Sequence, residues 1–102
     1  MLKFRETETF SNWIEGLRDP RAKAQIVRRL ARATAGNFGD VEPVGEGISE
    51  MRVDMGPGYR VYFARQGEVV YILLCGGDKK SQRRDIAMAK RLWAKIKGSA
   101  SK

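Results

Sequence analysis

Histidine is absent from this sequence of 102 residues, and cysteine occurs once. Without histidine, the chain cannot form a Ser-His-Asp or Cys-His catalytic group, nor an ordinary zinc site with a histidine ligand. The single cysteine, Cys75, excludes an internal disulfide and a zinc site of four thiolates. We therefore expect chemistry that uses no metal and no cofactor.

Long apolar runs are missing as well. No stretch approaches the roughly 20 apolar residues of a membrane span, and residues 1–10 contain glutamates where a signal peptide would be apolar. We expect a cytoplasmic protein without a membrane helix. The length favours a single compact domain over residues 1–97, followed by a frayed tail over 98–102.

Acidic residues are in the minority, since twelve Asp and Glu stand against twenty Lys and Arg, a formal charge of +8. Such an excess attracts nucleic acid, because counterions are released on binding, and it also attracts acidic proteins. A positive surface that only keeps the protein soluble is the alternative, because charge alone carries little specificity.

Helical periodicity marks the first third of the chain. After a short possible strand over residues 2–5, apolar residues at 10, 13, 14 and 17 share one face of a helix. Asp19 and Pro20 are typical of a helix start and Gly36 of its end. The second helix is predicted to bury Ile26, Val27, Leu30 and Ala33. Its many cations are expected on a solvated face, with partner binding as the alternative.

Residues 36–47 are rich in turn-forming residues and are predicted to be an ordered loop. Beyond them, residues 48–55, 59–65 and 69–75 alternate as strands, and glycines between them predict antiparallel hairpins. A last helix is expected after Ser81 as its cap. Its buried side is predicted to consist of Ile86, Ala89, Trp93 and Ile96.

The first hairpin allows a prediction of register. A three-residue turn over 56–58 would place Val53 opposite Val61 and Met51 opposite Phe63, which joins apolar side chains on one face. A two-residue turn would mix polar and apolar side chains. The longer turn is therefore preferred.

The opposite face of the same hairpin would be polar. Asp54 would lie opposite Arg60 and Arg52 opposite Tyr62, and a two-residue turn over 66–67 would bring Tyr71 beside Tyr62. We expect this face to be exposed and to carry the chemistry.

Five segments of the chain, in their order and spacing, resemble the RelE/HigB toxin superfamily (RelE/ParE superfamily), in its phage-derived Gp49-like addiction module killer branch. They are Gly36–Asp40, Pro43–Gly47, Ser49–Arg52, Gly56–Phe63 and Leu73–Gln82. The match covers nearly the whole chain. It implies an α+β, RelE-like fold in which two N-terminal helices pack on a twisted, mainly antiparallel sheet, in the order β-α-α-β-β-β-α.

The resemblance also implies a function. It is that of the toxin in a type II toxin–antitoxin system, which inhibits translation by ribosome-dependent mRNA cleavage. The implied partners are a cognate helix-turn-helix antitoxin, in a hetero-oligomer, and the ribosome with its mRNA. Two alternatives stay open: a nonenzymatic gyrase inhibitor like the ParE toxins, and a degenerate toxin that only binds antitoxin.

RNA carries its own nucleophile, the 2′-hydroxyl, so a nuclease needs to align it, stabilise the growing charge and move protons. Arg60 matches the family's strand arginine and is the first candidate to bind the phosphate. Lys79, Lys80 and Arg52 are predicted to be catalytic with it. The alternatives are a salt bridge from Arg60 to Asp54 and a solvated turn for the lysines.

Four further residues are predicted to bind RNA. Tyr62 and Tyr71 could stack on bases, and Arg83 and Arg84 could hold flanking phosphates. A tyrosine whose pKa is lowered by nearby cations could act as a base. Cys75 is expected to be an inert, partly buried thiol. The large aromatic side chains expected in the core are Phe10, Trp13, Phe63 and Trp93.

Overall fold

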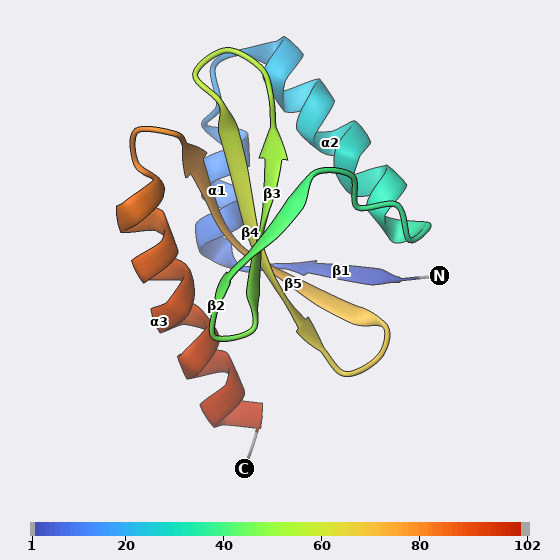
Figure 1. Cartoon of the computed structure of the whole chain (residues 1–102), viewed down its shortest axis with the longest axis vertical. Helices are drawn as coiled ribbons and strands as arrows, with labels where there is room; N and C mark the ends of the chain where they lie inside the picture. The colour runs from blue at the N-terminus through green and yellow to red at the C-terminus, as the bar shows by residue number, and fades with distance from the viewer. Residues whose placement is uncertain (1, 101–102) are drawn as a thin grey trace.

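The computed structural model describes residues 2–100, which form a five-stranded sheet and three helices (Figure 1). The elements are β1 (Lys3–Glu6), α1 (Glu8–Glu15), α2 (Pro20–Thr34), β2 (Val41–Gly45), β3 (Ile48–Val53), β4 (Tyr59–Gln66), β5 (Val70–Asp78) and α3 (Gln82–Ala100). The strand order is β1-β5-β4-β3-β2, and only the β1–β5 pair is parallel. The predicted α+β class and mainly antiparallel sheet are confirmed.

Side chains at the two helix starts explain where α1 and α2 begin. The hydroxyl of Thr7 accepts a hydrogen bond from the amide of Phe10 at 3.0 Å and donates one to the carbonyl of Leu74 at 2.6 Å, which ties α1 to β5. Asp19 accepts from two amides of the first turn of α2 at 3.0 and 3.3 Å. Pro20 follows as the first helical residue, as predicted.

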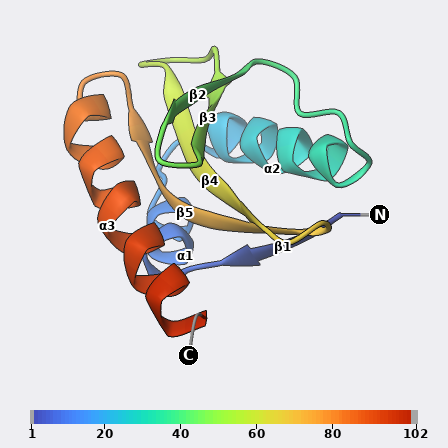
Figure 2. The same cartoon turned by 60° about the horizontal axis from the view of Figure 1, so that its bottom comes forward.

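The sheet separates two hydrophobic cores, because α1 and α2 cover one face and α3 covers the other (Figure 2). The first core combines Phe10 and Ile26 with alternate residues of the strands. The second combines Trp93 and Ala89 with Tyr62. The polar face of the hairpin is therefore not open, as the sequence had suggested, but largely covered by α3. What remains accessible is the end of the sheet beside the β3–β4 turn.

The β3–β4 hairpin has a longer turn than predicted. β3 ends at Val53 and β4 begins at Tyr59, so residues 54–58 connect them. Met51 consequently lies opposite Val61 and not opposite Phe63. Because the register differs by two residues, every side chain keeps its predicted face. The apolar face is confirmed although its pairs are wrong.

The same shift changes the neighbours on the polar face. Arg52 lies opposite Arg60, and Glu50 lies opposite Tyr62. The predicted pairs of Arg60 with Asp54 and of Arg52 with Tyr62 are therefore wrong. Two arginines now meet directly, which requires a carboxylate nearby to offset their repulsion.

Strand β2 lies in the segment that was predicted to be a loop. It pairs antiparallel with β3 at the edge of the sheet, with an irregularity between Pro43 and Gly45. Most of its side chains are exposed, so it shows no apolar alternation. Pro43 is tolerated because an edge strand has a free side that needs no N–H donor. The sequence pattern could not reveal this strand.

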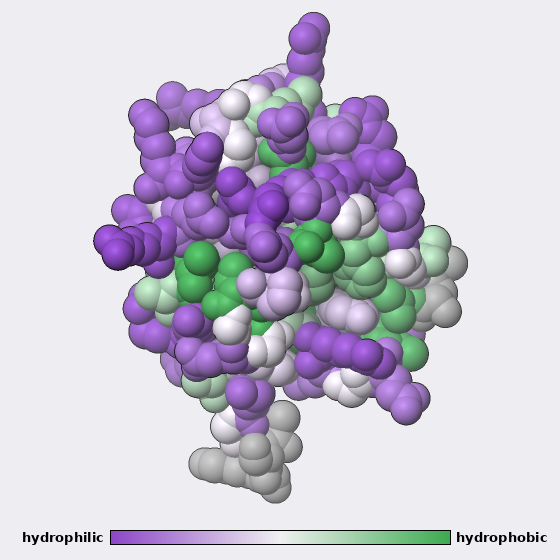
Figure 3. All heavy atoms as spheres, in the orientation of Figure 1, coloured by the Kyte–Doolittle hydropathy of each residue, from purple (hydrophilic) through white to green (hydrophobic). Residues whose placement is uncertain are grey.

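One helix prediction needs correction, because Val27, predicted to be buried in α2, is 52% exposed. α3 runs to Ala100. The fraying expected over residues 98–102 stays a prediction, and residues 101–102 lie outside the described residues. Figure 3 shows hydrophobic side chains in patches across one face of the molecule, between hydrophilic ones. No helix within residues 2–100 is long and apolar enough to cross a membrane.

Gly76 and Gly77 of β5 are needed because helices approach the strand on both faces. A Cβ atom at Gly76 would overlap the ring of Trp13 in α1, and one at Gly77 would overlap the carboxylate of Asp85 in α3. The glycine pair therefore lets both layers pack closely on one strand.

We predict that Gly76→Ala lowers the free energy of unfolding by about 1–3 kcal/mol, because the rigid Trp13 ring must move to admit a methyl group. Urea unfolding measures the change. Gly98→Ala in α3 is the matched control, because nothing lies within 4 Å of its added methyl group; it should raise stability by about 0.5–1 kcal/mol. Wild-type stability of Gly76→Ala would contradict this packing.

Candidate functional site

Three of the four residues predicted to be catalytic line one pocket, at the end of the sheet where β3 and β4 are joined. Arg52 and Arg60 lie opposite each other on these strands, and Lys79 follows β5. Together with Asp40 and Asp54 they surround a volume of about 200 Å³, which we call the arginine pocket.

A second hollow starts at the next residue of the chain. Lys80, Arg83 and Arg84 line it together with Asp78 and Ser81, around a volume of about 450 Å³. We call it the basic hollow. All three cations are exposed, and no ion pair within 4.0 Å joins them to another of residues 2–100. Their charge is available to an anionic partner.

A buried carboxylate that was not predicted lies behind the arginine pocket. Glu50 is 2% exposed, and its Oε2 accepts hydrogen bonds from Arg52 Nε and Arg60 Nη1, both at 3.1 Å. Its Oε1 accepts from Gln82 Nε2 of α3 at 2.8 Å. The partner of Arg60 is therefore Glu50 and not Asp54. The available sequence signal was that Glu50, like Asp54, alternates onto the strand face that carries both arginines.

The two arginines differ in how far they are engaged. Arg52 forms ion pairs with Asp40 at 3.7 Å, with Glu42 and with Glu50, and its side chain is 34% exposed. Three carboxylates thus offset its charge. Arg60 pairs only with Glu50 in the described chain, and its side chain is 13% exposed. Because fewer carboxylates offset the charge of Arg60, it is the arginine of this pair that can attract an anionic ligand.

The loop that presents Asp40 is held by a buried arginine of α2. Arg29 donates to the carbonyls of Arg52 at 2.6 Å, Phe38 at 3.2 Å and Asp40 at 3.5 Å. Gly39 takes a φ of 69°, and a Cβ there would lie 2.9 Å from the Arg29 guanidinium. Burial lowers the pKa of Arg29. The sequence predicted a solvated role for this arginine, and its structural role is a correction.

The turn after β5 fixes where the lysines project. Asp78 Oδ1 accepts from the amides of Lys80 at 2.9 Å and Ser81 at 3.1 Å. The Ser81 hydroxyl contacts Asp85 Oδ2 at 2.5 Å, at the start of α3. Ser81 directly precedes α3, as predicted. These bonds hold a tight turn whose exposed corner consists of Lys79 and Lys80.

The two tyrosines predicted to bind RNA are not at the arginine pocket's opening. Tyr62 is 0% exposed under α3, so it cannot stack on a base in this conformation. Its hydroxyl has no hydrogen-bond partner within residues 2–100. Burial raises the pKa of Tyr62, and the Glu50 carboxylate raises it further. For Tyr62, a role as base through a lowered pKa is therefore contradicted.

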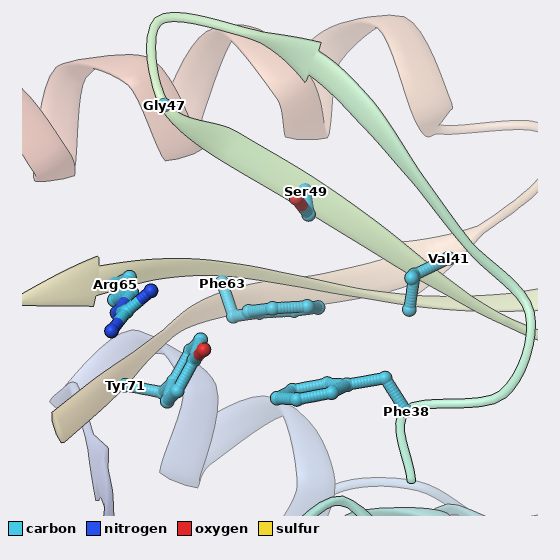
Figure 4. A pocket seen from close by; sticks show the side chains of 7 residues that line it. All are labelled: Phe38, Val41, Gly47, Ser49, Phe63, Arg65 and Tyr71. Atoms are coloured by element: carbon cyan, nitrogen blue, oxygen red, sulfur yellow. The ribbon is translucent and has the colours of Figure 1, made fainter. Parts of the chain in front are cut away.

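Tyr71 lies on the other face of the sheet. The β4–β5 turn spans residues 67–69, which places Tyr71 opposite Arg65 and not beside Tyr62. Its ring packs against Phe38 and Phe63, at 5.1 and 5.9 Å between centroids. These rings line a separate pocket of about 290 Å³, shown in Figure 4. Its one cation, Arg65, already donates to two backbone carbonyls of the turn.

The residue types that commonly bind metals or act as nucleophiles form no additional site in the described part of the chain. Cys75 is buried, and burial, with a smaller effect of the Asp85 carboxylate, raises the pKa of its thiol to about 12. Within residues 2–100, no three His, Cys, Asp or Glu side chains are grouped so as to hold a metal ion. The cations of the arginine pocket and the basic hollow are the groups that can act on a ligand.

The sequence is also similar to known proteins. The model of a family described as phage-derived protein Gp49-like (DUF891) matches residues 12–94. The chain belongs to the Gp49-like family. This family is toxin-like and related to toxin–antitoxin systems. An uncharacterized protein of Haemophilus influenzae is 50% identical to the Gp49-like chain over 91 residues, which cover 89% of this chain and 92% of the relative.

We predict that Cys75 of this Gp49-like protein reacts with a thiol reagent at pH 8 at least about a hundredfold more slowly than in the urea-unfolded chain. The reason is that the thiolate is the reactive form, and a pKa near 12 leaves almost none of it at pH 8. The release of a chromogenic thiol measures both rates. Equal rates would show that the thiol is accessible and ionised, against the structure.

Proposed function

We propose that this Gp49-like protein is the toxin of a type II toxin–antitoxin system of the RelE/HigB kind, and that it cuts mRNA on the ribosome. The observation that supports the proposal is the placement of Arg60 and Lys79 in one pocket that borders the exposed cations of the basic hollow. A path of positive charge beside a small pocket suits a polyanion whose phosphate must be held at one point.

The reaction that these residues can support is attack by the RNA's own 2′-oxygen on the adjacent phosphorus. The new O–P bond forms as the bond to the 5′-oxygen breaks, which leaves a 2′,3′-cyclic phosphate and a 5′-hydroxyl. Arg60 would stabilise the charge on the phosphate oxygens. Lys79 would contribute further positive charge and a proton to the departing 5′-oxygen. Asp40 and Asp54, which line the same pocket, are the carboxylates able to accept the 2′-hydroxyl proton.

The remaining predicted residues take supporting roles in this proposal. Lys80, Arg83 and Arg84 would bind flanking phosphates, because they are exposed and adjacent in the basic hollow. Arg52 would fix the pocket wall, because three carboxylates already engage it. The ribosome would help to orient the mRNA, which requires a cytoplasmic location. A helix-turn-helix antitoxin would restrain the toxin in a hetero-oligomer.

One observation favours a second candidate function. Carboxylates offset the charge of Arg52 fully and that of Arg60 in part, and Tyr62 is buried. A chain with such a restrained site could be a degenerate toxin that only binds its antitoxin. The two candidates differ in one result: an active toxin expressed without antitoxin arrests growth and translation, whereas a binding module does not.

Arg60→Ala should abolish most of the RNA cleavage by a folded protein. Loss of one such charge contact in a transition state is worth about 3 kcal/mol, or about a hundredfold in rate. Arg60→Lys should recover only part of the rate, because a point charge cannot replace the planar guanidinium. Single-turnover cleavage of mRNA on programmed ribosomes measures these rates.

The matched control is Arg65→Ala, which removes an exposed arginine of the same strand from the opposite face of the sheet. It should leave cleavage unchanged. Thermal melts must show that each variant is folded. Wild-type cleavage by folded Arg60→Ala would remove Arg60 from the mechanism, and absence of cleavage and growth arrest by the wild type would favour the binding module.

A further inference from the structure

Among the charged residues that the structure describes, Glu50 is the least exposed, at 2%. A buried carboxylate is costly unless it is paired and hydrogen-bonded. Here both oxygens are bonded: Oε2 accepts from Arg52 and Arg60, and Oε1 accepts from Gln82. The donors come from β3, β4 and α3. One carboxylate therefore links the two strands of the arginine pocket to the first residue of the last helix.

The orientation of Arg60 depends on this carboxylate. Its Nη1 donates to Glu50 at 3.1 Å, and its Nε is buried without a hydrogen-bond partner within residues 2–100. The contact with Glu50 is thus the one hydrogen bond that orients the guanidinium in the described chain. The small exposed part of the side chain lines the arginine pocket. Without Glu50, the guanidinium would keep its charge but lose its fixed direction.

The same carboxylate also sets the position of α3. Gln82 begins this helix, and its amide donates to Glu50 at 2.8 Å. Arg83 and Arg84 follow directly and line the basic hollow. Glu50 therefore holds the phosphate-binding arginine and the start of the basic helix in one fixed relation.

We propose that Glu50 is a positioning residue, which orients the Arg60 guanidinium toward a phosphate before RNA arrives. This inference rests on the proposed function of Arg60. A group that is already oriented loses little freedom on binding and stabilises a transition state more than a mobile one. Glu50 acts through Arg60 and touches no reacting atom. The substrate class is the phosphodiester of single-stranded RNA.

The first arm of the test needs no RNA. Because Arg60 Nε is shielded from water, its N–H should give a slowly exchanging NMR signal, and ¹⁵N relaxation reports its order. In Glu50→Gln, we expect relaxation to report low order for this N–H, or the signal to disappear because the proton exchanges with water. The matched control is Gln82→Ala, which removes the hydrogen bond to Glu50 Oε1 and leaves both arginine contacts at Oε2 in place. In this variant the Arg60 N–H should stay ordered. Equal order in Glu50→Gln and wild type overturns the inference.

The second arm measures single-turnover cleavage on programmed ribosomes. Glu50→Gln should slow the cleavage step about ten- to a hundredfold, as misplacement of a reacting contact does, with little change in ribosome affinity. In an Arg60→Lys background the same substitution should have almost no further effect, because there is no guanidinium left to orient. Effects that multiply in the double variant would indicate a merely structural role and overturn the inference.

The two arms separate this inference from the proposed function. If Arg60 loses order in Glu50→Gln but even the wild type cuts no RNA, the proposed function fails and the orienting role stands. If the wild type cuts RNA and Glu50→Gln cuts equally well with Arg60 ordered, the inference alone fails. Urea unfolding shows whether Glu50→Gln folds. If it does not, Glu50→Asp takes its place, because it keeps the charge but is too short to hold both arginines and should also release Arg60.

Discussion

The structure depends most on one buried ionic contact, between the Glu50 carboxylate and the arginines of the neighbouring strands. Removing one partner of such a contact commonly costs about 3–5 kcal/mol, because a buried charge is left uncompensated. From Arg52 the network continues to Glu42 of β2, and through its carbonyl to Arg29 of α2. Gln82 extends it to α3. The charge network thus crosses the sheet and connects elements that pack on opposite faces.

This arrangement divides the cations around the arginine pocket and the basic hollow into two groups. Arg29, Arg52 and Arg60 are partly or fully buried and engaged by carboxylates or carbonyls, so they define the shape of the arginine pocket. The cations after β5 are exposed on a tight turn and on the first turn of α3, where their charge can meet a polyanion. Arg60 lies at the boundary, held from behind by Glu50 and open to the pocket in front.

Local signals in the sequence predict much of this fold. The caps of α2 and the alternation of β3 and β4 depend on neighbouring residues alone, and an error of two residues in register leaves side chains on the same face. Edge strand β2 has exposed side chains and therefore no pattern to detect. The burial of Tyr62 and the role of Glu50 depend on where α3 packs on the sheet. This tertiary packing is not encoded in the local sequence pattern. Arg60 and Lys79 line one pocket because the start of β4 pairs with the end of β5, so Arg60 lies beside the residues that precede Lys79.

The chemical ends of the RNA products test the central claim most directly. mRNA from ribosomes incubated with the purified protein is ligated and sequenced with and without removal of terminal phosphates. Attack by the 2′-oxygen, aided by the cations around Arg60, predicts fragments with a 2′,3′-cyclic phosphate and a 5′-hydroxyl. Fragments with a 3′-hydroxyl and a 5′-phosphate, or mRNA that stays intact at saturating protein, would contradict the account.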